Sequence, residues 1–539
     1  MPTAERTASG VASGLAEPLR VPAFRGLWAA NLASNFGSLI HNVGAAWLMT
    51  SLVSSADMVA LVQTAMLVPI LLFAIVAGAV ADLRDRRLVL MAAQLWMAAV
   101  ALILALAAWR GWVGPWTLLA FTFLLGIGGA VNGPTFQAVV RELVPPHTLA
   151  AAVTVNSISF NLARSLGPAL GGLIVALAGP EAAFLVNALT YVPLILALAL
   201  WRRTRPAEDL PGERISEAVV NGLRYVRETR TIRAVTTRSA IFGFAATATL
   251  ALLPVVARNE VTGGPLTFGL LLGAFGVGAL LGAFAMQPLR RRWSAELIIA
   301  GLTALAALAL LGTATLRAVP LLSLALALGG AAWLGSLSSF NIMVQQSTAS
   351  WVQARVLAIY QTVLFGAMAA GAWAWGYLAA ATSVTAALAT AALMMAASLG
   401  LAGWLRLPSG PPPDLSPRRV PGEPVTALAI AEDRHDVTVT IEYRVPPAHA
   451  AAFARAMDEI GHMRRRDAAT RWQLLQDTAE PERWQETFSV SSWMAYLRQR
   501  RRGTTADEAL IERARALIDP STPPLVRRFV ARDTHSRFG

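Results

Sequence analysis

The 539-residue sequence contains no cysteine and no lysine, and only 14% of its residues are charged. Without cysteine, the chain can form no disulfide and no thiolate metal site. Its six histidines are scattered, without the paired spacing of a zinc site. No G-x-x-x-x-G-K-S/T motif occurs, which excludes a P-loop ATPase in this chain. We therefore expect no metal site and no cofactor.

The scarcity of charge accompanies a hydrophobic content of 55%, whereas soluble domains carry roughly a quarter charged residues. A window of about 20 apolar residues spans the hydrocarbon core of a membrane. Such windows recur twelve times, at residues 27–50, 57–80, 88–109, 115–139, 150–178, 182–201, 237–257, 265–288, 294–315, 319–344, 352–379 and 383–405. The sequence predicts an all-α membrane protein with twelve transmembrane helices in two six-helix halves. An even number of crossings places both ends of the bundle on one side.

This pattern divides the chain into six parts. They are an N-terminal tail (1–24), an N-terminal six-helix half (25–201), a charged central loop (202–236), a C-terminal six-helix half (237–405), a proline-rich linker (406–434) and a C-terminal domain (435–539). The N-terminal tail has no apolar core like that of a signal peptide. In the central loop, ISEAVVNGLRYV places Ile215, Val219, Leu223 and Val226 on one stripe. This stripe predicts a helix on the inner membrane surface, with a ligand site as the alternative.

Arginine supplies every basic side chain except the histidines, and its distribution predicts the orientation. If the N-terminus is cytoplasmic, the inner connections carry seventeen arginines and the outer connections carry three, Arg110, Arg258 and Arg317. This bias predicts an inner-membrane protein with both termini cytoplasmic. The formal charge of +13 is then mainly a topology signal. A nucleic-acid partner would require a basic surface with interleaved aromatics, which the sequence lacks, so the expected partners are the lipid bilayer and a small-molecule substrate.

The C-terminal domain follows a different pattern. VTVTIEY alternates as a strand, PAHAAAFARAMDEIGHM fits an amphipathic helix, and RWQLLQD and RWQETFSV are two further strands. SSWMAYLRQRRR and ADEALIERARALI are predicted helices, and PLVRRFVA can close the sheet. This order predicts a cytoplasmic α+β domain with a ferredoxin-like fold.

Arg164 lies near the centre of the fifth predicted span, within NSISFNLARSLGPALGG. A centred arginine costs roughly 3 kcal/mol on the membrane-insertion scale, so we expect it to face a cavity or a partner and not lipid. Asn161 lies one turn earlier and could help to hold it. We interpret Arg164 as lining a translocation path, where it contacts an anionic or hydrogen-bonding group of the substrate. The alternative is a structural arginine, satisfied by the carbonyl that a nearby proline leaves free.

A polar stripe along span one points to the same path. Its members lie at i, i+4, i+7 and i+11: Asn31, Asn35, Ser38 and Asn42. His41 lies beside the stripe and could titrate near neutral pH, and no carboxylate lies deep in any predicted span. The predicted substrate path comprises Arg164, Asn161, Asn31, Asn35, His41, Asn42, Gln63 and Asn132. Hydrogen bonding between helices is the competing explanation for the polar residues.

The loop GAVADLRDRR, after span two, resembles the loop 2–3 signature of the major facilitator superfamily, and most closely its enterobactin-exporter branch. GAFAMQPLRRR, which begins at Gly282, lies at the matching place in the second half and indicates an internal repeat. The resemblance implies a gate on the cytoplasmic side that breaks when the halves rock. Its residues here are Gly78, Asp82, Arg86 and Arg87. The alternative is that these basic residues only enforce the topology.

ARSLGPALGG resembles the helix-five signature of antiporters and exporters in the same superfamily. The matching residues are Gly167, Pro168, Gly171 and Gly172. Pro168 cannot donate to the carbonyl of Arg164, so the helix can bend there. The family resemblance implies a secondary transporter, an exporter of a siderophore or drug by alternating access, with proton coupling.

The C-terminal domain resembles the antibiotic-biosynthesis-monooxygenase fold, which forms dimeric α/β barrels. The resemblance implies a homodimer through this domain. Five side chains could line a pocket or could form an aromatic core and a dimer interface: His449, His462, Trp472, Trp484 and Trp493. They form no recognisable catalytic set, so we expect a transporter and not an enzyme. A membrane-tethered oxygenase fused to a transporter and a non-transporting membrane sensor are the competing hypotheses.

Overall fold

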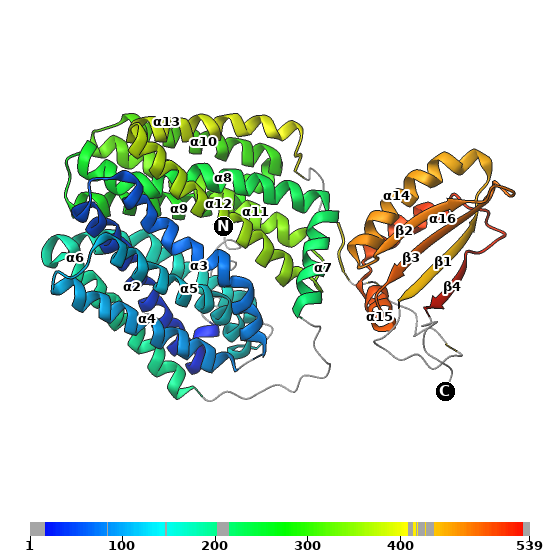
Figure 1. Ribbon diagram of the computed structural model, residues 1–539, viewed down its shortest axis with the longest axis horizontal. Coiled ribbons are helices and arrows are strands. Elements are labelled where there is room, and N and C mark those ends of the chain that lie inside the picture. The colour runs from blue at the N-terminus through cyan, green and yellow to red at the C-terminus, as the bar shows by residue number, and fades with distance from the viewer. Residues whose placement is uncertain are drawn as a thin grey trace, which may run out of the picture. The chain divides into compact units, whose positions relative to one another are not determined.

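The computed structural model describes residues 17–83, 85–145, 148–201, 215–407, 413–416, 418, 426 and 436–531. The chain forms two compact units. The first, the helical bundle, is drawn from residues 1–210, 236–340 and 361–407. The second, the tail unit, is drawn from residues 211–235, 341–360 and 408–539. The helices and strands of both units are labelled in Figure 1.

The bundle contains long apolar helices in two sets. The first set is α2 (Pro22–Leu52), α3 (Ala56–Leu83), α4 (Arg86–Trp109), α5 (Pro115–Leu143) and α6 (Leu149–Leu200). The second set is α8 (Arg230–Val255), α9 (Pro265–Arg292), α10 (Ala295–Thr315), α11 (Val319–Gln346), α12 (Gln353–Ala381) and α13 (Val384–Ala397). Among the described residues, ten helices are long and apolar enough to cross a membrane. The fold is therefore mostly helical and of a membrane-spanning kind.

The fifth and sixth predicted spans form one element, α6, which is 52 residues long. Gly179, which precedes Pro180, interrupts the helical backbone with a φ of 80°. This left-handed conformation is easily adopted only by glycine. The predicted spans 150–178 and 182–201 therefore correspond to the two segments of α6 on either side of Gly179.

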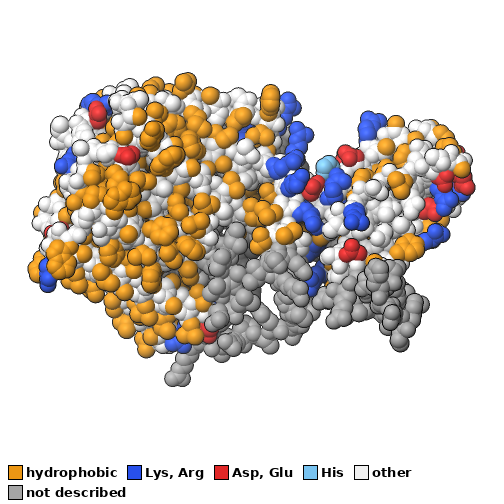
Figure 2. Space-filling model, in the orientation of Figure 1, with side chains coloured by type: hydrophobic (Ala, Val, Ile, Leu, Met, Phe, Trp, Pro, Cys, Tyr) orange, Lys and Arg blue, Asp and Glu red, His pale blue; other side chains and the backbone are white. Residues whose placement is uncertain are grey.

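The outer surface of the bundle is apolar, as Figure 2 shows for one face. Leucine side chains such as Leu177 and Leu200 are largely exposed along α6. Trp109, Trp112 and Trp116 are also exposed, close to the connection between α4 and α5. Tryptophan favours the interface between lipid and water. The distribution is that of a surface that faces lipid.

The C-terminal domain is an antiparallel four-stranded sheet with helices on one face. Its elements are β1 (Val437–Arg444), α14 (Ala450–Arg466), β2 (Arg471–Gln476), β3 (Arg483–Val490), α15 (Trp493–Arg502), α16 (Thr505–Arg515) and β4 (Leu525–Val530). The strand order is β2-β3-β1-β4. Alternate residues of β1, such as Val437 and Val439, are buried with Phe453 and Phe488 in one hydrophobic core. All four strands lie where the sequence predicts them.

The tail unit also contains α7 (Ile215–Glu228) and the connection 347–352 between α11 and α12. Tyr225 of α7 is buried, and its hydroxyl accepts a hydrogen bond from the amide of Ala349 over 3.1 Å. A β-carbon at Gly222 would lie 3.1 Å from side-chain atoms of Arg355 and Ile359. The predicted helix in the central loop is therefore confirmed, and it packs on this connection and the start of α12. Its position on the membrane surface stays a prediction.

Candidate translocation site

Small residues bring α6 and α9 into close contact across the two halves. A β-carbon at Gly269 would lie 2.7 Å from the α-carbon of Gly172 and 2.7 Å from the carbonyl oxygen of Pro168. About two turns further along both helices, the hydroxyl of Ser165 donates to the carbonyl of Gly276 over 3.0 Å. Small residues allow helix backbones in membranes to approach this closely. Pro168 and Gly172, two of the predicted gating residues, thus lie at the interface between the halves.

A second contact joins the halves between α3 and α12. The hydroxyl of Thr64 donates to the carbonyl of Ala369 over 3.2 Å. A β-carbon at Gly376 would clash with the β-carbon of Ala60. Both interfaces lie toward the helix ends that are joined by the connections 53–55, 261–264 and 382–383. We refer to this end of the bundle as the Thr50 end.

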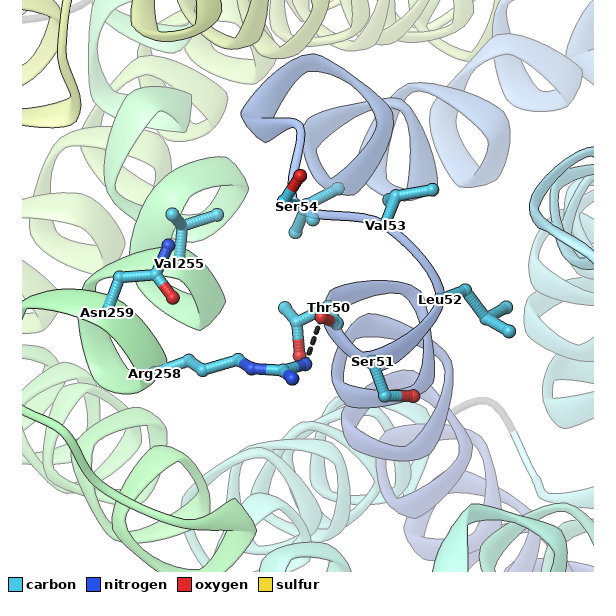
Figure 3. A pocket seen from close by; sticks show the side chains of 9 residues that line it. Thr50, Ser51, Leu52, Val53, Ser54, Val255, Arg258 and Asn259 are labelled. Atoms are coloured by element: carbon cyan, nitrogen blue, oxygen red, sulfur yellow. Dashed lines mark hydrogen bonds between the residues drawn. The ribbon is translucent and has the colours of Figure 1, made fainter.

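A pocket of about 290 Å³ lies between the halves at the Thr50 end (Figure 3). It is lined by Thr50, Ser51, Leu52, Val53, Ser54, Val59, Val255, Arg258 and Asn259. Arg258 belongs to a short π-helical segment, Val256–Glu260, and its guanidinium donates to the carbonyl of Thr50 in the last turn of α2. Free carbonyls give the end of a helix partial negative charge, which favours a cation there. Arg258 therefore ties the two halves together at this end.

Arg164 reaches across the same interface deeper in the bundle. Its guanidinium carbon lies 5.9 Å from the centroid of the Trp333 indole of α11. Trp333 is buried, and its ring N–H has no hydrogen-bond partner among the described residues. Phe242 of α8 and Phe275 of α9 pack on the same indole, with centroid separations of 6.5 and 6.0 Å. Arg164 of the first half thus meets an aromatic cluster of the second half, and it does so by a cation–π contact.

Three of the other predicted path residues bond to polar groups of the first half. The amide nitrogen of Asn31 donates to Asn156 over 3.4 Å. The amide nitrogen of Asn161 donates to the carbonyl of Ser157 over 2.8 Å. Asn132 accepts from Gln94 of α4 over 2.7 Å. These contacts agree with the alternative of hydrogen bonding within and between helices.

The remaining predicted path residues differ in burial. His41 is buried 4.8 Å from the ring of Phe184, measured between centroids, and neither ring nitrogen has a partner among the described residues. Asn35, Asn42 and Gln63 are half-buried. His41 therefore faces the second segment of α6. The side chains of the other three are partly exposed.

The predicted gating residues of the α3–α4 connection lie at the opposite end of the bundle. Gly78 and Asp82 are in α3, but their side chains fall outside the described residues. Asp85 caps α4 by accepting from the amide of Arg87 over 2.9 Å. The guanidinium of Arg86 lies 2.8 Å from Glu142 at the end of α5, and that of Arg87 donates to the carbonyl of Ala199 over 2.7 Å. These bonds join α4 to other helices of the first half.

The other two gating glycines pack inside the first half. A β-carbon at Gly167 would lie 3.0 Å from that of Leu39, and one at Gly171 would lie 3.0 Å from the α-carbon of Ile40. Both therefore hold α6 against α2. The helix-five motif therefore contributes to two interfaces: Gly167 and Gly171 contact α2, and Pro168 and Gly172 contact α9.

Sequence reasoning missed Trp333, Gln94 and the contact of Arg258. A tryptophan inside an apolar span carries no signal that separates a site residue from a core residue. Arg258 was placed in an outer connection, but the sequence does not say what it reaches. Gln94 in span three was a detectable signal, because an amide within an apolar helix requires a partner.

No group of three or more histidine, aspartate or glutamate side chains able to hold a metal occurs in the described parts of the chain. The site therefore consists of one arginine, an aromatic cluster and amide side chains. Such a set can bind and orient a polar organic molecule.

The model of the transmembrane secretion effector family, a family of major facilitator superfamily transporters, matches residues 12–536. The chain belongs to this family. Because the family and its relatives are transporters, the chain is a multi-pass membrane transporter and not an enzyme.

Two curated relatives are similar to this transporter. It is 26% identical over 421 residues to the multidrug efflux pump Tap of Mycobacterium tuberculosis. The aligned region covers 75% of this chain and 98% of Tap. It is 27% identical over 253 residues to the staphyloferrin A transporter of Staphylococcus aureus. This aligned region covers 46% of this chain and 63% of that protein. The second match thus spans less than two thirds of the relative's length.

Two solved structures share the fold. A bacterial homologue of the human lysosomal transporter Spinster, inward-facing and occupied, superposes with a TM-score of 0.56 at 13% identity, over 72% of this chain and 95% of that one. A D-xylose–proton symporter superposes with a TM-score of 0.54 at 14% identity, over 71% of this chain and 98% of that one. At this identity the likeness establishes the major facilitator architecture of the transporter.

Proposed function

We propose that this transporter exports a small organic molecule, a siderophore or a drug, by alternating access. The observation that carries the proposal is Arg164, which stands at the interface between the halves against Trp333. The two relatives, a multidrug efflux pump and a staphyloferrin A transporter, support the substrate class. A guanidinium suits a carboxylate or another oxygen-rich group on such a substrate.

The chain crosses the membrane twelve times in this proposal. Within the part of the chain that the structure describes, ten helices are long and apolar enough to cross a membrane. At 1.5 Å per residue, the 52 residues of α6 measure roughly 78 Å, which is enough for two crossings. The polar stripe of α2 lowers its hydropathy, but its 31 residues suffice for one more. The arginine bias supports an orientation in which both termini are cytoplasmic.

Alternating access would rock the halves about the interface of α6 with α9. The contacts of Gly172, Thr64 and Arg258 with the opposite half support a state that is closed at the Thr50 end. With cytoplasmic termini, this state faces the cytoplasm and can accept substrate. Gly78, Asp82, Arg86 and Arg87 would latch the cytoplasmic end in the opposite state.

We propose a ferredoxin-like fold for the C-terminal domain, with the order β-α-β-β-α-α-β and a four-stranded antiparallel sheet in its support. The open face of the sheet carries Leu475 and Leu525 at its two sides, both exposed. We propose that this face joins a second copy of the chain. Light scattering of the detergent-solubilised chain tests this, and a dimer that Leu475→Arg does not weaken would oppose it.

Export in inverted membrane vesicles tests the central proposal. Vesicles that contain the transporter should accumulate siderophores or dyes, and accumulation should depend on a pH gradient if protons drive it. His41 is the proposed proton carrier, so His41→Gln should remove the pH dependence. Vesicles that accumulate none of the tested compounds, with the protein correctly inserted, would contradict the proposal.

A further inference from the structure

The C-terminal domain contains a cavity of about 190 Å³ of its own, between the helix-covered face of the sheet and α14, α15 and α16. Val439, Ile441 and Phe488 supply its apolar wall. None of the five histidines and tryptophans that the sequence suggested for a pocket lines it; Trp472, Trp484 and Trp493 pack against the hydrophobic core instead. An apolar cavity of roughly 150 Å³ takes a benzene molecule. The cavity therefore fits one small ring with a substituent.

One polar side chain in this wall lacks a partner. Gln499 is 93% buried, and its amide nitrogen makes no hydrogen bond within the described residues. A buried donor without an acceptor carries a desolvation penalty, which a ligand oxygen would remove. Gln499 thus points to a ligand with an acceptor group.

The charges around the cavity favour an anionic ligand. Its two carboxylates, Asp467 and Asp507, both pair with Arg466, at 2.8 and 2.7 Å. Three arginines, Arg418, Arg464 and Arg500, line the same cavity, and Arg464 pairs with the buried Glu486 over 3.0 Å. A small molecule that enters the cavity therefore meets three guanidinium groups and two carboxylates, and a carboxylate is the ligand group that can accept hydrogen bonds from both a guanidinium and Gln499.

Residues next to the cavity wall contact α7 and the 347–352 connection within the tail unit. The guanidinium carbon of Arg466 lies 5.4 Å from the centroid of Tyr225 in α7. Arg502, one turn after Gln499 on α15, lies 4.1 Å from the centroid of Trp351 in the 347–352 connection. Glu228 of α7 also pairs with His462 of α14 over 3.0 Å. Arg466 and Arg502 do not line the cavity, but each adjoins a residue that does, Asp467 and Gly503 respectively.

We propose that the C-terminal domain is a ligand sensor. Its cavity binds a small carboxylic acid with an apolar body, and binding orders α15 and the Arg466 cluster. This ordering tightens the contacts on Tyr225 and Trp351. Since α7 leads into α8 and the connection joins α11 to α12, the bound state biases the second half of the transporter. A ligand shifts such an equilibrium by its difference in affinity for the two states. Only this last consequence rests on the proposed export function.

Benzoate binding to the full chain in lipid nanodiscs tests the proposal without any transport assay. Equilibrium dialysis should show saturable binding of benzoate and none of benzylamine, which has the same ring and the opposite charge. Gln499→Leu and the nearly isosteric Gln499→Glu should each weaken benzoate binding about tenfold or more. Gln485→Leu is the matched control, because Gln485 is exposed on the other face of the sheet, and it should bind as the wild type does.

Hydrogen exchange on the same samples tests the connection. Saturating benzoate should slow amide exchange in residues 220–228 and 347–352 of the wild type and leave the Gln499 variants unchanged. Equal binding by Gln499→Leu and wild type, or by benzylamine and benzoate, would overturn the ligand site. Binding without slower exchange in these two segments would overturn the sensor role. If benzoate binds and slows amide exchange as expected but the transporter exports nothing, only the proposed export function is contradicted.

Discussion

The guanidinium carbon of Arg164 in α6 lies 5.9 Å from the centroid of the Trp333 indole in α11. The two residues belong to opposite halves of the bundle, and each is costly where it stands. Arg164 is a charge within a membrane span, and the Trp333 ring N–H has no hydrogen-bond partner among the described residues. A substrate that bridges them would satisfy both groups. This pair is therefore the expected centre of the translocation path.

Replacement of the indole should weaken transport in a graded way. A cation–π contact contributes about 0.5–2 kcal/mol, and tryptophan is the best partner. Trp333→Phe should reduce export slightly, and Trp333→Leu should reduce it by up to about 30-fold. Trp373→Leu is the control, because Trp373 is exposed and stacks only on Tyr377 in the described contacts. Dye efflux from cells, normalised to membrane expression, measures the effect; a larger loss in the Trp373 variant would contradict the assignment.

The close approach of Gly172 and Gly269 should tolerate no added methyl group. Gly269→Ala places a β-carbon 2.7 Å from backbone atoms of α6, and such overpacking costs about 1–3 kcal/mol. The apparent Tm in detergent should fall. Gly301→Ala is the matched control in a membrane helix, since nothing lies within 4 Å of its added carbon. Equal Tm values for the two variants would show that the helices do not meet as described.

Arg258 should hold the Thr50 end closed. Arg258→Ala removes the bond to the Thr50 carbonyl and should expose the pocket between the halves. Because the chain has no native cysteine, Ser54→Cys can report this opening through its rate of labelling by an impermeant maleimide. We expect faster labelling in the Arg258 variant. Arg110→Ala serves as the control, since Arg110 stacks on Trp109 and Trp112 away from the pocket. An unchanged labelling rate in both variants would show that Arg258 does not hold this end closed.

Asp507 should stabilise the C-terminal domain. It forms the capping box of α16 with Thr504 and pairs with Arg466 over 2.7 Å. Asp507→Asn should lower the free energy of unfolding by about 1–3 kcal/mol. Glu512→Gln removes only an exposed pair with Arg515 and should change it by less than about 0.5 kcal/mol. Hydrogen exchange of the α16 amides in the full chain measures both.

The contribution of Asp507 should also depend on pH. Burial by itself raises the pKa of this carboxyl, but Arg466 and the Thr504 groups outweigh it and hold the pKa below the usual 3.8. An acid with a lowered pKa stabilises the fold above its unfolded pKa and loses this effect as the pH falls through the folded value. The stability difference between wild type and Asp507→Asn should therefore be constant above about pH 5 and shrink below about pH 4. A difference that grows on acidification would contradict the pairing.

The sequence predicted the membrane helices and the strands well, because hydropathy and period-two alternation report burial directly. It predicted Pro168 and Gly172 as gating residues; both lie between the halves, and their gating role stays a prediction. It could not predict that Gly167 and Gly171 face α2, since the direction in which a kinked helix leans depends on its neighbours. Pairings such as Arg164 with Trp333 depend on contacts between residues far apart in the chain. One sequence without an alignment carries no signal for them.

The interpretation of the polar residues needed the structure for a different reason. Asn132 bonds to Gln94 and Asn161 bonds to the backbone, so helix packing explains part of a stripe that sequence reasoning assigned to substrate. A polar side chain in a membrane span must find a partner, and periodicity alone does not show whether that partner is protein or substrate.

The most direct test of the account is substrate efflux in proteoliposomes with Arg164→Gln. Glutamine keeps hydrogen-bonding capacity and removes the charge, and Arg110→Gln is the matched control at the bundle surface. We predict that Arg164→Gln lowers the export rate at least about tenfold at equal protein insertion, whereas Arg110→Gln exports at the wild-type rate. Wild-type export by Arg164→Gln would contradict a translocation path centred on this arginine.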